Sequence, residues 1–227
     1  MYGVQITTAD VKPTEHVERL RALGVAAVAD ALDRLGARDQ VMHHSIRPLI
    51  GGDRVAGRAF TIASEPNDAL LDDPYTHEIA AVDAVPAGAF VVIATQGSCE
   101  AAVWGELLGT VASRRGAIAA VSDGAVRDLA GLRQLALPTY AAAVSARDSA
   151  GRLQVTGHGG EVVCGGVSVA SGDLVLADED GVVVVPSALA EEAIAAAERK
   201  LSIEGVALSS LQEGTSLQSM YDEHRVL

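Results

Sequence analysis

The chain has 227 residues, enough for one large domain or two small ones, and its formal net charge is −13 at pH 7. Apolar residues make up 49% of it, which allows a buried core and argues against intrinsic disorder. An acidic protein repels nucleic-acid phosphates and anionic membranes, so we expect no nucleic-acid partner and no membrane partner. A local arginine and a metal ion can still attract an anionic substrate.

Aromatic residues make up only 3% of the chain, and 23 glycines punctuate it. A core of Ala, Val, Leu and Ile is typical of alternating strands and helices, so we expect an α/β fold in one domain over residues 1–227. Cys99 and Cys164 lack the spacing of a zinc or redox motif, and we expect two reduced thiols packed as small apolar groups. The polar N-terminus does not resemble a signal peptide, which favours a cytoplasmic protein.

The N-terminal half of the chain predicts an irregular arm over residues 1–13 and then a helix. A helical stripe of apolar residues runs from Val17 to Leu35, with Thr14 as the candidate cap and a break near Gly24. Further on, the pattern predicts strands over residues 55–63 and 89–95 and a helix over residues 76–85.

Two adjacent histidines, His43 and His44, invite a metal site. Neighbouring residues of an extended chain point to different sides, so the pair makes a poor chelate and we do not expect a metal there.

The middle of the chain carries its most distinctive charge pair. Residues 103–115 predict a helix, and residues 116–121 then predict a short buried strand that ends in a turn at Asp123-Gly124. Arg127 and Asp128 follow, where the next helix, residues 129–136, should begin. The pair can hold a metal and a substrate oxyanion, or it can be an ordinary acidic helix start beside a surface arginine.

Glycines interrupt the helix predicted over residues 103–115. Gly105 and Gly109 each lower its intrinsic helicity by roughly 1 kcal/mol relative to alanine. We expect them to be there so that a backbone or a ligand can approach closely.

The C-terminal third is rich first in strands and then in helices. A strand is predicted over residues 139–144, an irregular glycine-rich part over residues 152–163, and three strands between residues 167 and 186. Gly172-Asp173 and Asp180-Gly181 mark the turns between them. Residues 187–227 form a helical tail, with a helix over residues 188–201 and two short pieces at 206–211 and 217–221.

Three stretches match one known family in order and in spacing, namely Gly105–Gly109, Arg115–Asp128 and Gly165–Pro186. Over about residues 15–224 the chain resembles the 4-hydroxy-4-methyl-2-oxoglutarate aldolase / regulator of ribonuclease activity A (RraA-like) family. The resemblance implies a three-layer swivelling β/β/α sandwich. It also implies a homotrimer, or a hexamer, with active sites between neighbouring subunits.

Catalytic members of that family are divalent-metal-dependent class II pyruvate aldolases. They cleave 4-hydroxy-4-methyl-2-oxoglutarate and 4-carboxy-4-hydroxy-2-oxoadipate, and many also decarboxylate oxaloacetate. By its place in the motif, Asp128 matches the direct metal ligand, Arg127 the residue that holds the keto oxygen of pyruvate, and Glu106 an acidic residue that meets the metal through water. The resemblance thus implies a lyase that uses Mg²⁺ or another divalent ion such as Mn²⁺.

The same resemblance extends to the substrate pocket. The backbone amides of Leu107 and Leu108, beside Gly105, match those that receive the pyruvate carboxylate. A further acidic residue comes from the C-terminal helix of a neighbouring subunit and acts through water. Glu204 is the best match for it, and Glu198 is the second choice.

The proposed chemistry is consistent with the residues present. Cleaving the bond between C3 and C4 of a 2-oxo acid leaves a pyruvate enolate, whose charge Mg²⁺ and Arg127 can stabilise. Mg²⁺ keeps several waters and needs only one or two carboxylates, so a His/Cys cluster is not required. The general base can be a water held by the metal or by a glutamate.

The competing interpretation is a non-catalytic regulator that binds and inhibits a ribonuclease E-type endonuclease. Retention of Arg127, Asp128 and Glu106 favours the enzyme. The glycine-rich loop of a nucleotide site is missing, which argues against a methyltransferase. His77 is interpreted as structural, and His158 either lines the site or faces solvent.

Overall fold

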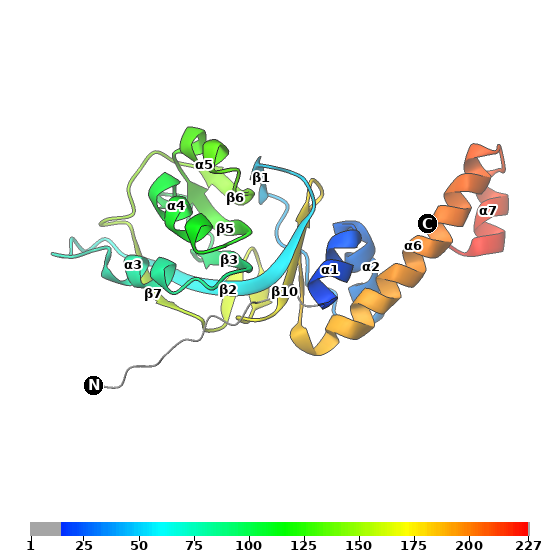
Figure 1. Ribbon diagram of the computed structural model, residues 1–227, viewed down its shortest axis with the longest axis horizontal. Coiled ribbons are helices and arrows are strands. Elements are labelled where there is room, and N and C mark those ends of the chain that lie inside the picture. Colours follow the sequence, from blue (N-terminus) through cyan, green and yellow to red (C-terminus); the bar gives the residue numbers. More distant parts are fainter. Residues whose placement is uncertain (1–14, 227) are drawn as a thin grey trace.

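A curled sheet of nine strands organises the protein, whose computed structural model describes residues 15–226 (Figure 1). The strand order is β1-β6-β5-β3-β2-β10-β11, with β4 beside β5 and β7 beside β2. The strands are β1 (Arg47–Ile50), β2 (Val55–Pro66), β3 (Ala89–Ala94), β4 (Ala102–Trp104), β5 (Ala119–Val126), β6 (Thr139–Val144), β7 (Leu153–His158), β10 (Leu174–Asp178) and β11 (Gly181–Val185). The predicted arm and the Thr14 cap lie outside the described residues.

The centre of the sheet is parallel and its flanks are antiparallel. Strands β2, β3, β5 and β6 run parallel to one another, and β4 runs parallel to β5. Strands β1, β7, β10 and β11 pair antiparallel with their neighbours. β3 and β11 are buried along their whole length, which explains their continuous apolar sequences.

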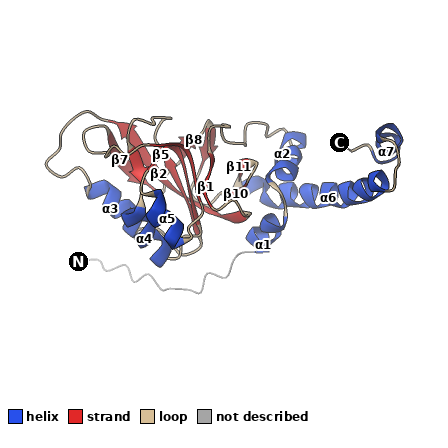
Figure 2. Cartoon of the chain, turned by 90° about the horizontal axis from the view of Figure 1, so that it is seen from above, coloured by secondary structure: helices blue, strands red, loops and turns tan. Residues whose placement is uncertain are grey.

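Helices cover the sheet on one face, and strands close over the other (Figure 2). Helices α3 (Thr76–Asp83), α4 (Glu106–Arg114) and α5 (Leu129–Leu135) enclose one apolar core with the parallel strands. A second core lies inside the curl of the sheet, beneath the hairpin of β8 (Val162–Cys164) and β9 (Val167–Val169). This curled α/β arrangement confirms the predicted fold class and a single domain.

A third apolar core joins three further helices to β10 and β11. These helices are α1 (Glu15–Ala22), α2 (Val25–Arg34) and α6 (Ala190–Gln212), which follows a short 3-10 turn (Ser187–Leu189). Arg19 binds Glu198 through two hydrogen bonds of 2.8 Å, and Lys200 binds Asp30, so ion pairs join α6 to α1 and α2. Among residues 15–226, no helix is long and apolar enough to cross a membrane.

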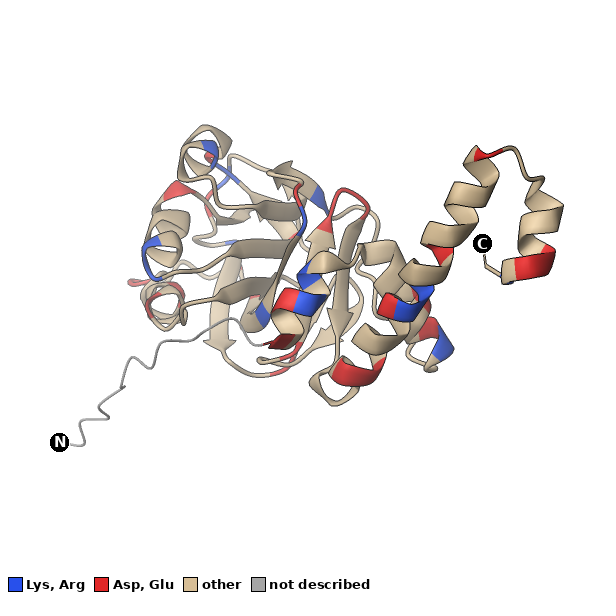
Figure 3. Cartoon of the chain, turned by 45° about the vertical axis from the view of Figure 1, so that its right-hand side comes forward, with Lys and Arg blue, Asp and Glu red and all other residues tan. Residues whose placement is uncertain are grey.

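The far half of α6 projects from the body of the molecule, and α7 (Leu217–His224) folds back beside it (Figures 1 and 2). Every charged residue between positions 201 and 224 is acidic, apart from the titratable His224 (Figure 3). This projecting half also exposes Ile203, Val206 and Leu208. The two pieces predicted over residues 188–201 and 206–211 are therefore one helix, because Gly205 lies within it without breaking it.

Two predictions near the Arg-Asp pair were wrong. The helix expected from residue 103 begins at Glu106, because Ala102–Trp104 pair with β5 as strand β4. Asp123-Gly124 is not a turn, since β5 continues to Val126 with an irregular register between Ser122 and Ala125. A side chain at Gly124 would come within 2.7 Å of Thr95, so this glycine allows a close approach inside the sheet.

Candidate active site

The carboxyl ends of three neighbouring parallel strands bring the charged residues together. Arg127 and Asp128 follow β5, Gly105 and Glu106 follow β4, and the loop after β6 contains Asp148. Carboxyl ends of parallel strands share one edge of a sheet, which is the usual place for a ligand in α/β folds. A cavity of about 440 Å³ opens at this edge and is lined by Tyr75, Glu78, Ile79, Ala102, Val103, Trp104, Gly105, Leu107, Leu108, Val111, Arg127, Asp128, Asp148 and Ser149.

Asp128 caps helix α5 in a strained backbone conformation. Its φ of 56° and ψ of 41° are left-handed, a region that Asp and Asn tolerate better than most residues. The side chain is 46% exposed, and its Oδ2 atom lies 3.4 Å from the backbone nitrogen of Glu106, which donates to it. The carboxylate of Asp128 therefore faces the start of α4 and stays open to solvent.

The glycines around this carboxylate leave room for it. A Cβ atom at Gly105 would lie 2.7 Å from Asp128 Oδ2, and one at Gly109 would lie 2.7 Å from a methyl carbon of Leu132. The structure places a side chain close to each glycine, where the approach of a backbone or a ligand was expected.

Glu106 is the first residue of α4, and its side chain lies against the first turn of α5. A Cβ atom at Gly131 would come within 2.2 to 2.5 Å of the carboxyl and Cγ atoms of Glu106. The glycine thus provides the space that the carboxyl group occupies. Glu106 therefore meets Asp128 through its backbone nitrogen, while its side chain lies beside α5 and does not line the cavity.

Arg127 lies between two carboxylates. Its Nε is 3.7 Å from Asp128 Oδ2, and its Nη1 is 3.1 Å from Asp148 Oδ1. The other oxygen of Asp148 accepts a hydrogen bond of 2.5 Å from the hydroxyl of Tyr75. The Tyr75 hydrogen bond, more than the charge of Arg127, lowers the pKa of Asp148, although partial burial opposes the shift.

Glu78 adds a third carboxyl group to the wall of the cavity, from helix α3. Burial raises its pKa to about 7, and the nearby charge of Asp148 adds to the shift while Arg127 opposes it. Tyr75, Glu78 and Asp148 were not among the predicted site residues. The only signal in the sequence was that Asp148 follows a strand next to β5.

The start of α4 offers free backbone donors to the same cavity. Its N-cap, Gly105, has no side chain to accept from the first N–H groups of the helix. The N–H of Glu106 donates to Asp128, which leaves the N–H groups of Leu107 and Leu108 for a ligand. Leu107 is 80% exposed and Leu108 is half-buried, and both line the cavity. Such N–H groups, at the positive end of a helix dipole, are suited to a carboxylate.

The residues present fit a magnesium ion held mainly by water and substrate. Asp128 and Glu106 provide two carboxylates, and Mg²⁺ prefers such oxygen ligands while retaining several waters. The space beside Gly105 accommodates the Asp128 carboxylate at the cavity, and the space beside Gly131 accommodates the Glu106 carboxyl next to α5. Within residues 15–226 no three His, Cys, Asp or Glu side chains are grouped as a complete protein cage, so a tightly chelated ion has no ligand set there.

The two candidates from the C-terminal helix are not part of this cavity in one chain. Glu204 pairs with Lys200 at 2.9 Å, and Glu198 pairs with Arg19. Both belong to α6, on the opposite side of the molecule from α4 and α5 (Figure 1). An acidic contribution from α6 to the site therefore requires a second chain.

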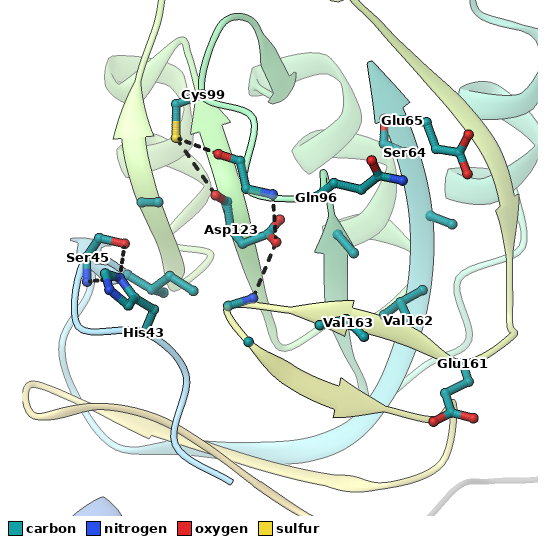
Figure 4. Close-up of a pocket in the computed structure, with 17 residues that line it drawn as sticks. His43, Ser45, Ser64, Glu65, Gln96, Cys99, Asp123, Glu161, Val162 and Val163 are labelled. Atoms are coloured by element: carbon teal, nitrogen blue, oxygen red, sulfur yellow. Dashed lines mark hydrogen bonds between the residues drawn. The ribbon is translucent and has the colours of Figure 1, made fainter. Parts of the chain in front are cut away.

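A larger cavity of about 860 Å³ lies on the face of the sheet that the β8-β9 hairpin covers (Figure 4). Its buried carboxylate, Asp123, accepts hydrogen bonds from the backbone N–H groups of Thr95, Gly97 and Gly165. These bonds hold the strand end around Gln96, whose φ is 56°. Asp123 is therefore used by the fold, and none of the predicted site residues lines this cavity.

The remaining histidines and the thiols do not line the cavity at Arg127, although His43 and Cys99 line the larger cavity. His77 and His158 are exposed and do not line the cavity at Arg127, and the ring of His158 lies 5.7 Å from that of Phe60. His43 bonds Ser45 at 2.9 Å. Both cysteines are free, but only Cys164 is packed in the core, whereas Cys99 is exposed, contrary to expectation.

Comparison with known proteins adds four relationships. Residues 25–184 match the model of the RraA-like family, described as Aldolase/RraA. A Halalkalibacterium halodurans protein named "Putative 4-hydroxy-4-methyl-2-oxoglutarate aldolase" is 31% identical over 192 residues, which cover 82% of this chain and 83% of that protein. Protein DlpA of Legionella pneumophila is 29% identical over 169 residues, and the match covers 74% of this chain but only 27% of DlpA, a much longer protein.

The fourth relationship is structural. The crystal structure of Streptomyces coelicolor RraAS2, described as an unusual member of the RNase ES inhibitor RraA protein family, superposes with a TM-score of 0.77 at 28% identity. The superposition covers 86% of this chain and 96% of RraAS2.

Proposed function

We propose that this chain, which belongs to the RraA-like (Aldolase/RraA) family, is a divalent-metal-dependent lyase that forms pyruvate from small 2-oxo acids. The substrates we propose are 4-hydroxy-4-methyl-2-oxoglutarate or 4-carboxy-4-hydroxy-2-oxoadipate, with oxaloacetate decarboxylation as a side activity. The main support is the convergence of Arg127 and Asp128 at one cavity beside the start of α4, the helix that Glu106 begins.

Each half of a bound 2-oxo acid has a partner in this proposal. The amides of Leu107 and Leu108 receive the carboxylate, and the Arg127 guanidinium donates to the keto oxygen. When the C3–C4 bond breaks, negative charge develops on that oxygen, where Arg127 is already placed to stabilise it.

Asp128 and Glu106 are the residues that would hold the metal, Asp128 directly and Glu106 through water. A bound divalent ion would supply Lewis-acid polarisation of the 2-oxo acid. Asp128 keeps its carboxylate exposed at the cavity edge, and its nearest cation, Arg127, is also paired with Asp148. The carboxylate of Asp128 is thus available to a ligand.

We propose that the site is completed by Glu204 of a neighbouring subunit in a homotrimer or hexamer. Two features support this arrangement. The far half of α6 projects with exposed Ile203 and Val206 on either side of Glu204, and the cavity exposes Leu107 at its rim. Apolar patches of this kind on both surfaces favour contact between them.

A second candidate function is regulation of a ribonuclease E-type endonuclease without catalysis. Its support is the likeness to RraAS2, whose description names it as a member of an RNase ES inhibitor family. A regulator has no need for Arg127 and Asp128 at one cavity beside a helix that begins with Glu106, so we rank the lyase first.

The decisive experiment is an assay of pyruvate release from oxaloacetate and from 4-hydroxy-4-methyl-2-oxoglutarate with added Mg²⁺ or Mn²⁺, and with a chelator. The proposal requires turnover that the chelator abolishes and that added metal restores. Chelator-insensitive turnover would exclude the metal-dependent mechanism. Absence of turnover on both substrates under all metals, together with inhibition of the endonuclease, would favour the regulator.

A further inference from the structure

We propose that Asp148 and Tyr75 are positioning residues for Arg127, and that together they set the plane of its guanidinium group at the cavity. The inference rests on the proposed function, because it assumes that Arg127 donates to the substrate's keto oxygen. Nothing in the motif of residues 115–128 points to either residue, since both come from other parts of the chain.

The contacts form a chain of three side chains from three elements. Tyr75, at the start of α3, donates to one oxygen of Asp148, and the other oxygen accepts from Arg127 at 3.1 Å. One carboxylate is therefore held on both of its oxygens. A carboxylate fixed in this way can hold a guanidinium at a defined angle as well as at a defined distance.

Asp148 is the better placed of the two carboxylates that flank Arg127. Asp128 lies farther away, at 3.7 Å, and we have assigned its oxygens to the metal. A carboxylate that binds a metal has less charge to offer to a neighbouring cation. In the loaded site, Asp148 is then the principal partner of the arginine.

The loop that contains Asp148 is itself fixed in place. The backbone nitrogen of Ala102 donates to the carbonyl of Arg147 at 3.0 Å, and Arg152 donates to the carbonyl of Asp148 at 3.1 Å. Ser149 is buried, and its carbonyl accepts from the backbone nitrogens of Arg152 and Leu153. The loop is thus tied to β4 on one side and to its own turn on the other.

Positioning matters because the side chain of Arg127 is 37% exposed and long, and it would otherwise occupy many rotamers. Misplacement of a catalytic donor by about 1 Å can cost on the order of 100-fold in rate. The pair should therefore affect kcat more than KM, since the arginine's contact with the keto oxygen strengthens as charge develops there.

The test uses Asp148→Asn, which keeps the shape but removes the charge, and Tyr75→Phe, which removes one hydroxyl. We expect kcat to fall about tenfold in Asp148→Asn and about threefold in Tyr75→Phe, with KM changed less than about threefold. The matched control is Glu100→Gln, which breaks the 3.2 Å ion pair with Arg147, the neighbour of Asp148, and should leave kcat unchanged.

A double-mutant cycle separates positioning from a merely structural role. If Asp148 acts through Arg127, Asp148→Asn should have little further effect on kcat in an Arg127→Lys background. An equal loss in both backgrounds would overturn the proposal, and so would a Tyr75→Phe variant with unchanged kcat. A fall in thermal stability that accounts for the loss of activity would also contradict it.

A measurement without turnover distinguishes failure of this inference from failure of the proposed function. The Nε–Hε resonance of Arg127 can be assigned in ¹⁵N NMR spectra by its disappearance in Arg127→Lys. A held guanidinium should show slow rotation about its Cζ–Nε bond in the wild type and faster rotation in Asp148→Asn. Equal rotation rates in the two proteins would refute the positioning role whether or not the protein is a lyase.

Discussion

Gly105 and Asp128 are so close that a Cβ atom at position 105 would stand 2.7 Å from the Oδ2 atom of Asp128. The two residues lie in different strand-to-helix connections, Gly105 between β4 and α4 and Asp128 between β5 and α5. The space for the carboxylate proposed to hold the metal is therefore provided by the glycine that follows the neighbouring strand, and this relationship leads to the first prediction.

Gly105→Ala should displace the carboxylate of Asp128 and weaken Mg²⁺ binding at least about tenfold, an effect of the size seen when ligand-supporting groups are altered. Backbone strain is not the cause, since the φ of Gly105 is −166°, an extended value that alanine adopts freely. Calorimetric titration with Mg²⁺ measures the effect. Gly205→Ala is the control, because nothing lies within 4 Å of a Cβ there and the change should stabilise helix α6 by about 1 kcal/mol. Unaltered Mg²⁺ affinity in Gly105→Ala would disprove the prediction.

Asp128→Asn and Asp128→Ala should both abolish metal-dependent turnover but differ in stability. Asparagine tolerates the left-handed backbone at this position, whereas alanine pays about 1 kcal/mol for a φ of 56°. In urea unfolding of the apoprotein, Asp128→Asn should therefore have nearly the free energy of unfolding of the wild type, and Asp128→Ala a lower one. Turnover at the wild-type rate in the folded Asn variant would remove Asp128 from the metal site.

Arg127→Lys keeps the positive charge but loses the planar fork of donors. We expect kcat to fall at least about tenfold, which corresponds to roughly 1.4 kcal/mol of barrier. Steady-state kinetics at saturating metal gives the value, and circular dichroism confirms the fold. An unchanged kcat would show that Arg127 does not stabilise the developing oxyanion.

Glu78 should make the stability of the apoprotein depend on pH. Its pKa is raised from 4.5 to about 7 in the folded protein, chiefly by burial, so the folded state holds a proton that the unfolded chain has already released. The contribution of Glu78 to the free energy of unfolding is then fully present below about pH 4.5 and is lost as the pH rises to 7. Glu78→Gln should remove this loss of stability. At pH 8 its free energy of unfolding should exceed that of the wild type by on the order of 2 kcal/mol, after allowance for solvent screening.

Urea unfolding at pH 5 and pH 8, with a chelator present, measures the difference. Glu223→Gln changes an exposed carboxylate on α7 and serves as the control. A Glu78→Gln variant that loses stability between pH 5 and pH 8 as steeply as the wild type would contradict the assignment.

Glu204 and Asp128 should complement each other between chains. Separately, Asp128→Asn is expected to be inactive and Glu204→Gln weakly active, because every site in each protein lacks one carboxylate. After unfolding and refolding together, about a quarter of the sites in random mixed trimers would carry both wild-type residues. Recovery of activity on mixing would show that the site is shared, whereas no recovery would place Glu204 outside it.

Local sequence pattern was sufficient for the outline of the fold. The continuous apolar runs of β3 and β11 predict buried strands, and the turns at Gly172-Asp173 and Asp180-Gly181 separate β9, β10 and β11 as expected. These signals are local, because they depend on which residues suit a buried strand or a tight turn. The Arg127-Asp128 pair and its place at a helix start were equally visible.

Tertiary structure alone decided the rest, and the reason is distance along the chain. Ala102–Trp104 form a strand because β5 lies beside them, and Asp123-Gly124 continue a strand because Thr95 approaches the glycine. The residues that hold Arg127 also come from distant parts of the chain. Tyr75 donates a hydrogen bond to Asp148, which lies 73 positions later in the sequence. Contacts at such separations leave no periodicity in the sequence. The sequence by itself therefore determined the charged pair and the strands that place it, and only the folded chain determined what surrounds that pair.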